Sequence, residues 1–237
     1  MRKINKKPIF VFLMLFTSTT IGAIFAVINL LHFIPLGEYK NITKISLSIL
    51  MIFLFNILVY RLFLLKFPLI EGAYKEDTKE DFIYSVYALY YLLLFNSVIY
   101  SLMIPIPIMR SIYMALGARF GKNTYCAGVI LDPPFVHLGN DTIIGYDSVL
   151  CPHSIEGMQL SFSKIKMGNN VTIGMKSIIM AGVTIEDHGI VAAGSVVKKD
   201  TYIKTGEVWG GVPAKLLSSD NKHIQIDEIE RSIHKAS

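Results

Sequence analysis

Residues 167–200 read MGNNVTIGMKSIIMAGVTIEDHGIVAAGSVVKKD, and an aliphatic residue returns at every sixth position of this stretch. An α-helix would scatter side chains that repeat every six residues around its axis, and a flat strand requires a period of two. A period of six fits a coil of three short strands that turns a corner after every six residues. The same register extends to both sides of the stretch, through Leu138, Ile144, Leu150, Met167, Ile173, Ile179, Ile185, Val191, Val197 and Ile203.

Each place in the six-residue unit has its own expected task. The aliphatic residue points into the prism, a small or β-branched residue packs beside it, and Gly or Asn takes the corner, where the backbone must bend sharply. Stacked coils advance by one strand spacing of about 4.8 Å, so these units build a column about five coils tall. The open end of the column needs a cap. Residues 218–237 carry Ile226, Ile229 and Ile233 on one helical face, which predicts a short C-terminal capping helix, with a neighbouring subunit as the alternative.

The repeat has one break, at residues 151–164, CPHSIEGMQLSFSK. His153 takes the fourth place of its unit, at a corner, so we expect its ring to project outward, and residues 156–166 should leave the coil as a loop that walls off a cleft. A neutral imidazole can take and return a proton near neutral pH, which predicts a catalytic His153. Glu156 either holds that imidazole, as a carboxylate does in a catalytic triad, or is a solvated loop carboxylate.

The first half of the chain is much more apolar than the second. Mean hydropathy is +0.49 and only 17% of the 237 residues are charged. The excess lies in three runs, about 9–31, 45–65 and 82–109, and the first two are long enough to cross a bilayer as helices. Lys and Arg gather before the first run and after the second, so the positive-inside rule predicts a hairpin with both ends in the cytoplasm.

The third run permits two topologies. It carries no charge and is long enough to span, which would place everything after it outside the cell. Asn96 and Ser97 lie at its centre, Pro105 and Pro107 near its end, and Arg110 follows it directly. These features favour a re-entrant or interfacial segment that returns to the cytoplasmic side.

Several classes of function are disfavoured. The net charge of +5 is mostly membrane-flanking, and the second half shows no Lys/Arg cluster with interleaved aromatics, so no nucleic-acid partner is expected. Cys126 and Cys151 read as reduced packing residues rather than a disulfide. No metal site is expected, because no set of converging ligands is evident.

Residues 116–217 resemble the hexapeptide-repeat, left-handed parallel β-helix acyltransferases. The resemblance is strongest over the quoted stretch and the GGVPAKLL that follows at residues 210–217. This part of the chain is similar to the galactoside and related sugar O-acetyltransferases. The His-x-x-Glu pattern before a loop also resembles the hexapeptide domain of polylysine synthetase-like proteins. The repeat alone indicates a fold rather than a reaction.

The resemblance implies acetyl-CoA, or another acyl-CoA, as the co-substrate. In this family a histidine just ahead of an extended loop is catalytic, and His153 occupies that place. A backbone group at Ala193 would contact the pantetheine arm, and Gly174 would either let that arm lie close or serve a coil corner. Lysines suit the phosphates of the coenzyme as compact charges, which assigns Lys198, Lys199 and Lys215 to them. Family members are usually homotrimers, so a trimer with clefts between prisms is expected.

The expected class is a membrane-anchored all-β protein, with a transmembrane helical hairpin and further membrane-embedded helices before a left-handed parallel β-helix and a short C-terminal helix. The expected domains are residues 1–110, 111–217 and 218–237. The expected function is acyl-CoA-dependent O-acyl transfer, most simply O-acetylation, to a hydroxyl of a lipid-linked sugar or envelope polysaccharide precursor at the cytoplasmic face of the plasma membrane. Transfer to an amine and a non-catalytic trimeric membrane scaffold are the alternatives.

Overall fold

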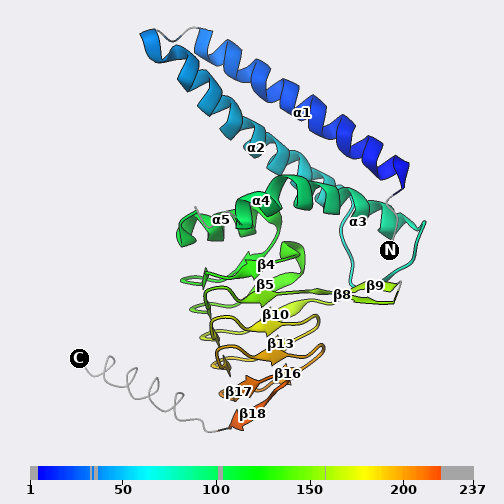
Figure 1. Cartoon of the computed structure of the whole chain (residues 1–237), viewed down its shortest axis with the longest axis vertical. Coiled ribbons are helices and arrows are strands. Elements are labelled where there is room, and N and C mark those ends of the chain that lie inside the picture. The colour runs from blue at the N-terminus through cyan, green and yellow to red at the C-terminus, as the bar shows by residue number, and fades with distance from the viewer. Residues whose placement is uncertain (1–4, 33, 35–36, 101–103, 158, 220–237) are drawn as a thin grey trace. The chain divides into compact units, whose positions relative to one another are not determined.

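The computed structural model describes residues 5–32, 34, 37–100, 104–157 and 159–219 (Figure 1). The chain divides into two compact units near residue 101, and residues Glu71–Ala73 belong to the second unit. The predicted C-terminal capping helix lies outside the described residues, apart from Ser218 and Ser219.

The first unit is helical. Helix α1 packs against both α2 and α3, and the third helical stretch runs on from α3 through a π-helical turn, η2, into α4. An aromatic cluster joins the helices; Tyr60 lies 5.5 Å, centroid to centroid, from Phe95, and Phe12 lies 4.9 Å from Tyr90. The elements of this unit are α1 (Lys6–His32), η1 (Gly37–Tyr39), α2 (Lys40–Lys66), α3 (Lys79–Tyr90), η2 (Tyr91–Phe95) and α4 (Asn96–Tyr100).

Three helical stretches in the described residues are long and apolar enough to cross a membrane, namely Lys6–His32, Gly37–Lys66 and Lys79–Tyr100. The first two contain the predicted runs 9–31 and 45–65. The third continues through Asn96 and Ser97 without a break, because its irregularity is the π-helical turn that ends at Phe95. Pro105 and Pro107 begin a separate helix, α5 (Ile106–Leu116), where the missing amide hydrogens cost nothing.

Helix α5 belongs to the second unit and packs on the first coils of the β-helix. The hydroxyl of Tyr113 donates to the carbonyl of Gly128 (3.1 Å) and accepts from the amide of Ile130 (3.2 Å). Arg110 donates from Nη2 to the carbonyl of Gly121 (2.9 Å). These bonds hold α5 against the end of the column where stacking begins.

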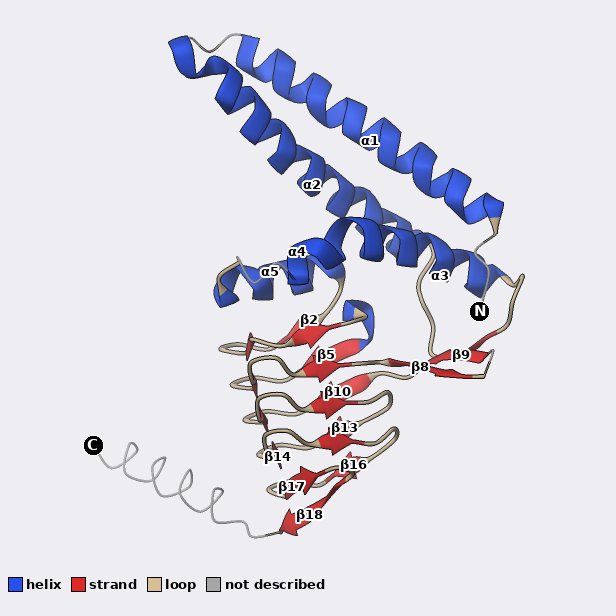
Figure 2. Ribbon diagram, viewed as in Figure 1, coloured by secondary structure: helices blue, strands red, loops and turns tan. Residues whose placement is uncertain are grey.

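The column itself is a three-sided parallel β-helix (Figure 2). We name its sides by their first strands: the β2 sheet (β2, β5, β10, β13, β16), the β3 sheet (β3, β6, β11, β14, β17, β18) and the β4 sheet (β4, β7, β12, β15). The strands are β2 (Arg119–Phe120), β3 (Tyr125–Cys126), β4 (Val129–Ile130), β5 (Val136–Leu138), β6 (Ile143–Ile144), β7 (Val149–Leu150), β10 (Ile165–Met167), β11 (Thr172–Ile173), β12 (Ile178–Ile179), β13 (Thr184–Ile185), β14 (Ile190–Val191), β15 (Val196–Val197), β16 (Tyr202–Ile203), β17 (Val208–Gly211) and β18 (Ala214–Ser218).

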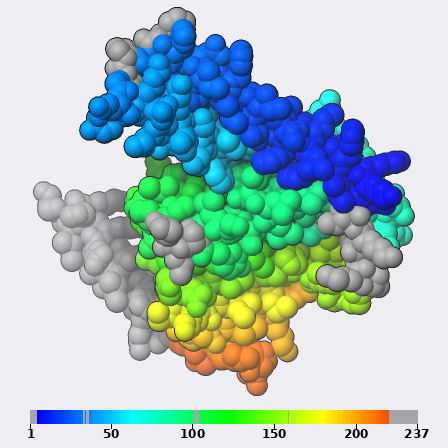
Figure 3. Space-filling view, turned by 45° about the horizontal axis from the view of Figure 1, so that its top comes forward, coloured from blue at the N-terminus to red at the C-terminus, as the bar shows by residue number. Residues whose placement is uncertain are grey.

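The predicted six-residue register is confirmed. All ten aliphatic residues of the register are buried. For nine of these ten residues, the residue three positions later has a left-handed backbone conformation. Most of these nine corner residues are Asn, Asp or Gly, which tolerate that conformation best. Figure 3 shows the coils following one another in sequence order, from green through yellow to orange. The corner residues are Asp141, Asp147, Asn170, Lys176, Gly182, His188, Gly194, Asp200 and Gly206.

Two expectations about the fold are corrected or refined. The chain is not all-β, because most of the described residues before Leu116 are helical. At the far end of the column, the edge of β17 is covered by the antiparallel strand β18, which pairs Gly210 with Lys215. A strand therefore covers this edge within the described residues.

Candidate active site

The break in the repeat is an antiparallel hairpin that leaves one corner of the β-helix. Strands β8 (His153–Glu156) and β9 (Gln159–Phe162) pair His153 with Phe162 at the base and Glu156 with Gln159 near the tip. Strand β1 (Gly72–Tyr74) lies on the other side of β9 and completes a three-stranded sheet. In a regular coil, residues that stack on one another are 18 positions apart in the sequence, as are Asn169 and Asp187. The coil that contains the hairpin is longer, so Asn140 and Asn169 stack although they are 29 positions apart.

His153 stands at the point where the hairpin departs. In the regular units, the residue at its place has a positive φ and turns the corner; His188, for example, has a φ of 61°. His153 instead belongs to strand β8 and pairs across the hairpin. The chain therefore begins its excursion at His153, earlier than the expected residue 156, and the histidine is fixed by strand pairing rather than by a turn.

A buried carboxylate holds the imidazole. Asp132 Oδ2 lies 2.5 Å from His153 Nδ1, and the side chains are 7% and 29% exposed respectively. The ring of Phe162 meets the imidazole edge-on at 6.0 Å and stacks on Phe135 at 4.8 Å. Because Asp132 binds Nδ1, the imidazole is oriented with Nε2 as the nitrogen available for chemistry.

Asp132 is positioned by the sequence Asp-Pro-Pro-Phe. Its carbonyl accepts the amide of Phe135 (3.0 Å), closing the short 3₁₀ turn η3 (Pro133–Phe135). The two prolines fix the backbone of this turn, and the buried Phe135 anchors it against Phe162. The stiff turn thus delivers a carboxylate to the corner from which the hairpin of the next coil emerges.

The environment raises the pKa of His153 to about 10. The largest cause is the hydrogen bond with Asp132, the second is the Cys151 side chain, and burial opposes both by lowering the pKa. The Cys151 thiol also donates to the carbonyl of His153 (3.3 Å). At pH 7 the imidazole is therefore almost wholly protonated in the site as it stands.

Glu156, the carboxylate predicted to serve His153, has another partner. Its Oε1 lies 2.9 Å from Nζ of Lys199, and its side chain is 70% exposed near the tip of the hairpin. The carboxylate that contacts His153 is instead Asp132, which was not among the predicted site residues. The available signal was an acidic residue inside the apolar segment LDPPFVHL, one coil before the break.

The residues assigned to the coenzyme fall on two corners of the column. Gly174 and Ala193 stack at the corner between the β3 and β4 sheets, and a Cβ on Gly174 would lie 2.3 Å from the amide nitrogen of Ala193. Lys198 and Lys199 follow β15, at the corner between the β4 and β2 sheets. The hairpin of His153 departs from this same corner two coils earlier in the chain, after β7. Lys215 is exposed on β18. The β4 sheet lies between these two corners.

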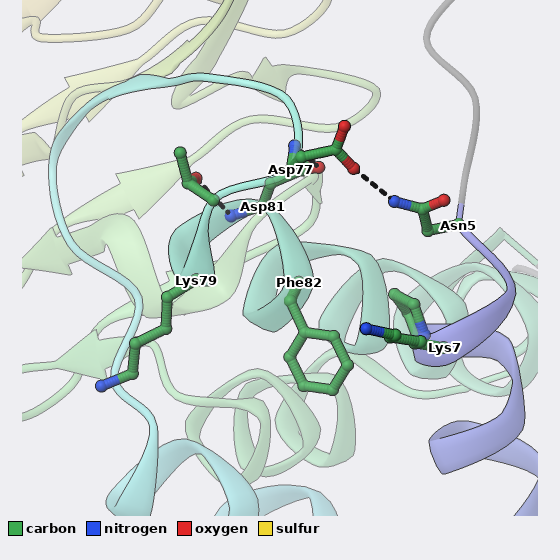
Figure 4. Close-up of a pocket in the computed structure, with 8 residues that line it drawn as sticks. Asn5, Lys7, Asp77, Lys79, Asp81 and Phe82 are labelled. Atoms are coloured by element: carbon green, nitrogen blue, oxygen red, sulfur yellow. Dashed lines mark hydrogen bonds between the residues drawn. The ribbon is translucent and has the colours of Figure 1, made fainter.

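A hollow lies in the first unit, at the start of α1 and α3 (Figure 4). It has a volume of about 380 Å³, and Asn5 Nδ2 donates across it to Asp77 Oδ1 (2.5 Å). Its lining includes Lys7 and Lys79 as well as two aspartates, and it contains none of the predicted site residues. Within the described residues, no group of three or more His, Cys, Asp or Glu side chains could hold a metal ion.

Comparisons with known proteins identify the repeat. Residues 164–199 match the family model described as bacterial transferase hexapeptide (six repeats). The chain is 33% identical over 122 residues to the galactoside O-acetyltransferase of Escherichia coli (strain K12), covering 46% of this chain and 59% of that protein. It is 38% identical over 80 residues to gamma carbonic anhydrase 1, mitochondrial, of Arabidopsis thaliana, covering 34% of this chain and 25% of that protein.

Among solved structures, the chain is similar to a hexapeptide-repeat acetyltransferase of Vibrio cholerae complexed with acetyl coenzyme A. The identity is 28% and the TM-score 0.41, over 44% of this chain and 60% of that one. The chain thus spans less than two thirds of the length of these relatives. Because the curated relatives include both an acetyltransferase and a carbonic anhydrase, the repeat alone does not select the reaction.

Proposed function

We propose that this protein is a membrane-bound O-acetyltransferase that uses acetyl-CoA to modify a hydroxyl of a lipid-linked sugar or envelope polysaccharide precursor. The observation that carries the proposal is the His153–Asp132 pair, placed at the one interruption of the β-helix. The similarity to the galactoside O-acetyltransferase supports transfer to a sugar oxygen.

The chain's own groups account for the proton movements of such a reaction. As the acceptor oxygen attacks the thioester carbonyl, Nε2 of neutral His153 takes the hydroxyl proton. Asp132, whose Oδ2 lies 2.5 Å from Nδ1, stabilises the resulting imidazolium. When the carbon–sulfur bond breaks, the imidazolium returns the proton to the departing thiolate, so that an ester and the free thiol of coenzyme A leave and the base is regenerated.

Acetyl-CoA is proposed to lie along the β4 sheet, between the two corners that carry the predicted residues. Ala193 would offer backbone groups to the pantetheine arm at one corner, and Lys198 and Lys199 would offer charge to phosphates at the other. Gly174 leaves space for the backbone of the next coil, so its first task is steric. Lys215 stays a proposed phosphate contact. We also propose a homotrimer, with clefts between neighbouring prisms.

The helical unit motivates the class of acceptor. Three stretches are long and apolar enough to span a membrane. Basic residues lie before the first apolar run and after the second, which favours placing both of these ends on the cytoplasmic side. Anchoring in the plasma membrane, with the β-helix in the cytoplasm where acetyl-CoA is made, would raise the effective concentration of a lipid-linked substrate.

The deciding experiment measures thiol release from acetyl-CoA by the detergent-purified full chain, supplied with a crude extract of lipid and polysaccharide precursors. We expect release that depends on the extract and is lost in His153→Ala. His188→Asn is the matched control, because His188 takes the same place in a regular unit and Asn tolerates its left-handed backbone. If wild type neither releases thiol nor binds coenzyme A, the non-catalytic scaffold replaces the enzyme; product found only on amines would make the protein an N-acetyltransferase.

A further inference from the structure

Three basic side chains stack directly above one another on the outward side of the β2 sheet. Arg119 pairs in register with His137, and His137 pairs in register with Lys166. We call this set the basic ladder. Adjacent parallel strands lie about 4.8 Å apart, so the three side chains present one continuous row. Arg119 and Lys166 are exposed, and His137 is half-buried between them.

At the middle of the ladder positive charges outnumber negative ones, because Arg119, Lys164 and Lys166 act on His137 against Glu71. Like charges directly opposite on adjacent strands destabilise a sheet unless something offsets them. Glu71 is the acid that acts on His137, and both of its oxygens are engaged by Lys164, at 2.6 Å from Nζ and 3.1 Å from the amide. Beyond Lys166, the carboxylates of Glu186 and Asp187 line one hollow with Lys166, so the positive charge of the ladder is strongest toward Arg119 and His137.

The electrostatic field at the middle of the ladder reflects this surplus. The pKa of His137 is lowered, first by burial and then by Arg119, Lys164 and Lys166, while Glu71 opposes them. His137 is thus neutral at pH 7 and offers an N–H donor between two fixed cations. An anion bound on the row would reverse the field and favour the charged imidazole.

The ladder adjoins the candidate active site from the side opposite the proposed coenzyme. Strand β9 ends at Phe162, the partner of His153, and the chain rejoins the column through Lys164 into β10, which carries Lys166. In Figure 2 the β8–β9 hairpin leaves the column at the level of β5 and β10, the strands of His137 and Lys166. A ligand on the β2 sheet could therefore present a hydroxyl at the corner of His153 while acetyl-CoA occupies the β4 sheet.

We propose that the basic ladder binds a phosphate or diphosphate group of the acceptor, the group that would join its sugar to a lipid. This inference rests on the proposed function and names the chemical feature by which the acceptor is recognised. Arg119 would grip two phosphate oxygens with its planar guanidinium, and Lys166 would act as a point charge.

The test uses inorganic pyrophosphate and the full chain in a neutral detergent, with saturating coenzyme A present to fill its own site. Calorimetry should show saturable binding to wild type that weakens at least about tenfold in Arg119→Gln/Lys166→Gln, because two charge-assisted contacts are lost. Lys176→Gln is the matched control, because Lys176 is an exposed lysine at the corner between the β3 and β4 sheets and is not on the β2 sheet. Equal affinity in the double variant, or no saturable binding to wild type, would overturn the proposal.

A second readout does not depend on that variant folding. Pyrophosphate should raise the pKa of His137 in wild type, followed by its imidazole NMR signals; an unmoved titration contradicts binding at the ladder. Vesicles of phosphatidylcholine with and without phosphatidylglycerol separate the two sources of phosphate. Binding only to the anionic vesicles, with none to pyrophosphate, would make the ladder a lipid-surface contact and reject the acceptor site. All of these experiments measure binding and not catalysis. A protein that binds pyrophosphate at the ladder but transfers no acetyl group would therefore refute the proposed function without refuting phosphate binding at the ladder.

Discussion

His153 and Asp132 form the residue pair on which the chemistry depends. A surface ion pair is usually worth little, but this carboxylate is buried, so the pair is shielded from water and tightly oriented. The pairing has a cost for catalysis, because the hydrogen bond with Asp132 keeps the imidazole protonated at neutral pH, although burial by itself lowers its pKa. A base with a raised pKa is stronger when neutral but less often available.

The first prediction concerns the pH dependence of the reaction. The neutral form of His153 appears only as pH rises toward its pKa of about 10, so kcat/KM should climb throughout the range from pH 6 to 9. Asp132→Asn removes the main cause of the shift, so the rising limb should move toward the ordinary value near 6.5, while the maximal rate falls by about 10²-fold or more. Steady-state kinetics over this pH range provides the measurement.

Glu156→Gln is the control for that prediction. Glu156 pairs with Lys199 near the tip of the hairpin, so this variant should keep the wild-type pH profile and lose far less rate than Asp132→Asn. A profile that shifts in Glu156→Gln but not in Asp132→Asn would return the orienting role to Glu156.

At the scale of elements, some places in the column admit no side chain because the next coil lies directly against them. Glycines at the second place of the unit lie against the backbone of the next coil, and for Gly174 the clash distance of 2.3 Å is to a main-chain atom that no rotamer change can move. The stacking of coils at 4.8 Å thus explains this glycine without reference to any ligand.

The second prediction follows from this packing. Gly174→Ala should lower the free energy of unfolding by about 1–3 kcal/mol or more, because adjacent coils must separate to admit the methyl group. Thermal unfolding in detergent, followed by circular dichroism, measures the change. Gly22→Ala is the control, since its Cβ meets nothing within 4 Å and alanine favours a helix. A Gly174→Ala protein as stable as the control would refute the steric explanation.

At the scale of the whole molecule, the open question is on which side of a membrane the β-helix lies. Three stretches meet the length and composition for spanning, and an odd number of spans would separate the N-terminus from the β-helix. The basic residues that follow the third stretch, from Arg110 on, favour the same side as the N-terminus. The number of candidate spans and the distribution of basic residues thus favour opposite sides of the membrane. The proposed cytoplasmic position of the β-helix is based on the basic residues.

The third prediction decides between them. A reporter enzyme that is active only in the cytoplasm, fused after Ser237, should be active, and one that is active only outside should be silent. The reverse pattern would place the β-helix outside, away from acetyl-CoA, and would remove the proposed donor. Fusions after Lys66, where we expect a cytoplasmic position in either case, control for expression.

The sequence by itself determined the β-helix, its register and its corners, because a period of six leaves one way to bury every aliphatic residue and the corner residues are set by local backbone preference. It also singled out His153 and the two long apolar helices. Only the tertiary structure decided that Asp132, rather than the nearer Glu156, serves His153. The two side chains come from different coils, and which residues meet across stacked coils depends on where an inserted hairpin begins and on how a proline turn aims a carboxylate. The basic ladder has the same origin, since Arg119, His137 and Lys166 are far apart in the chain and become neighbours only when the coils stack.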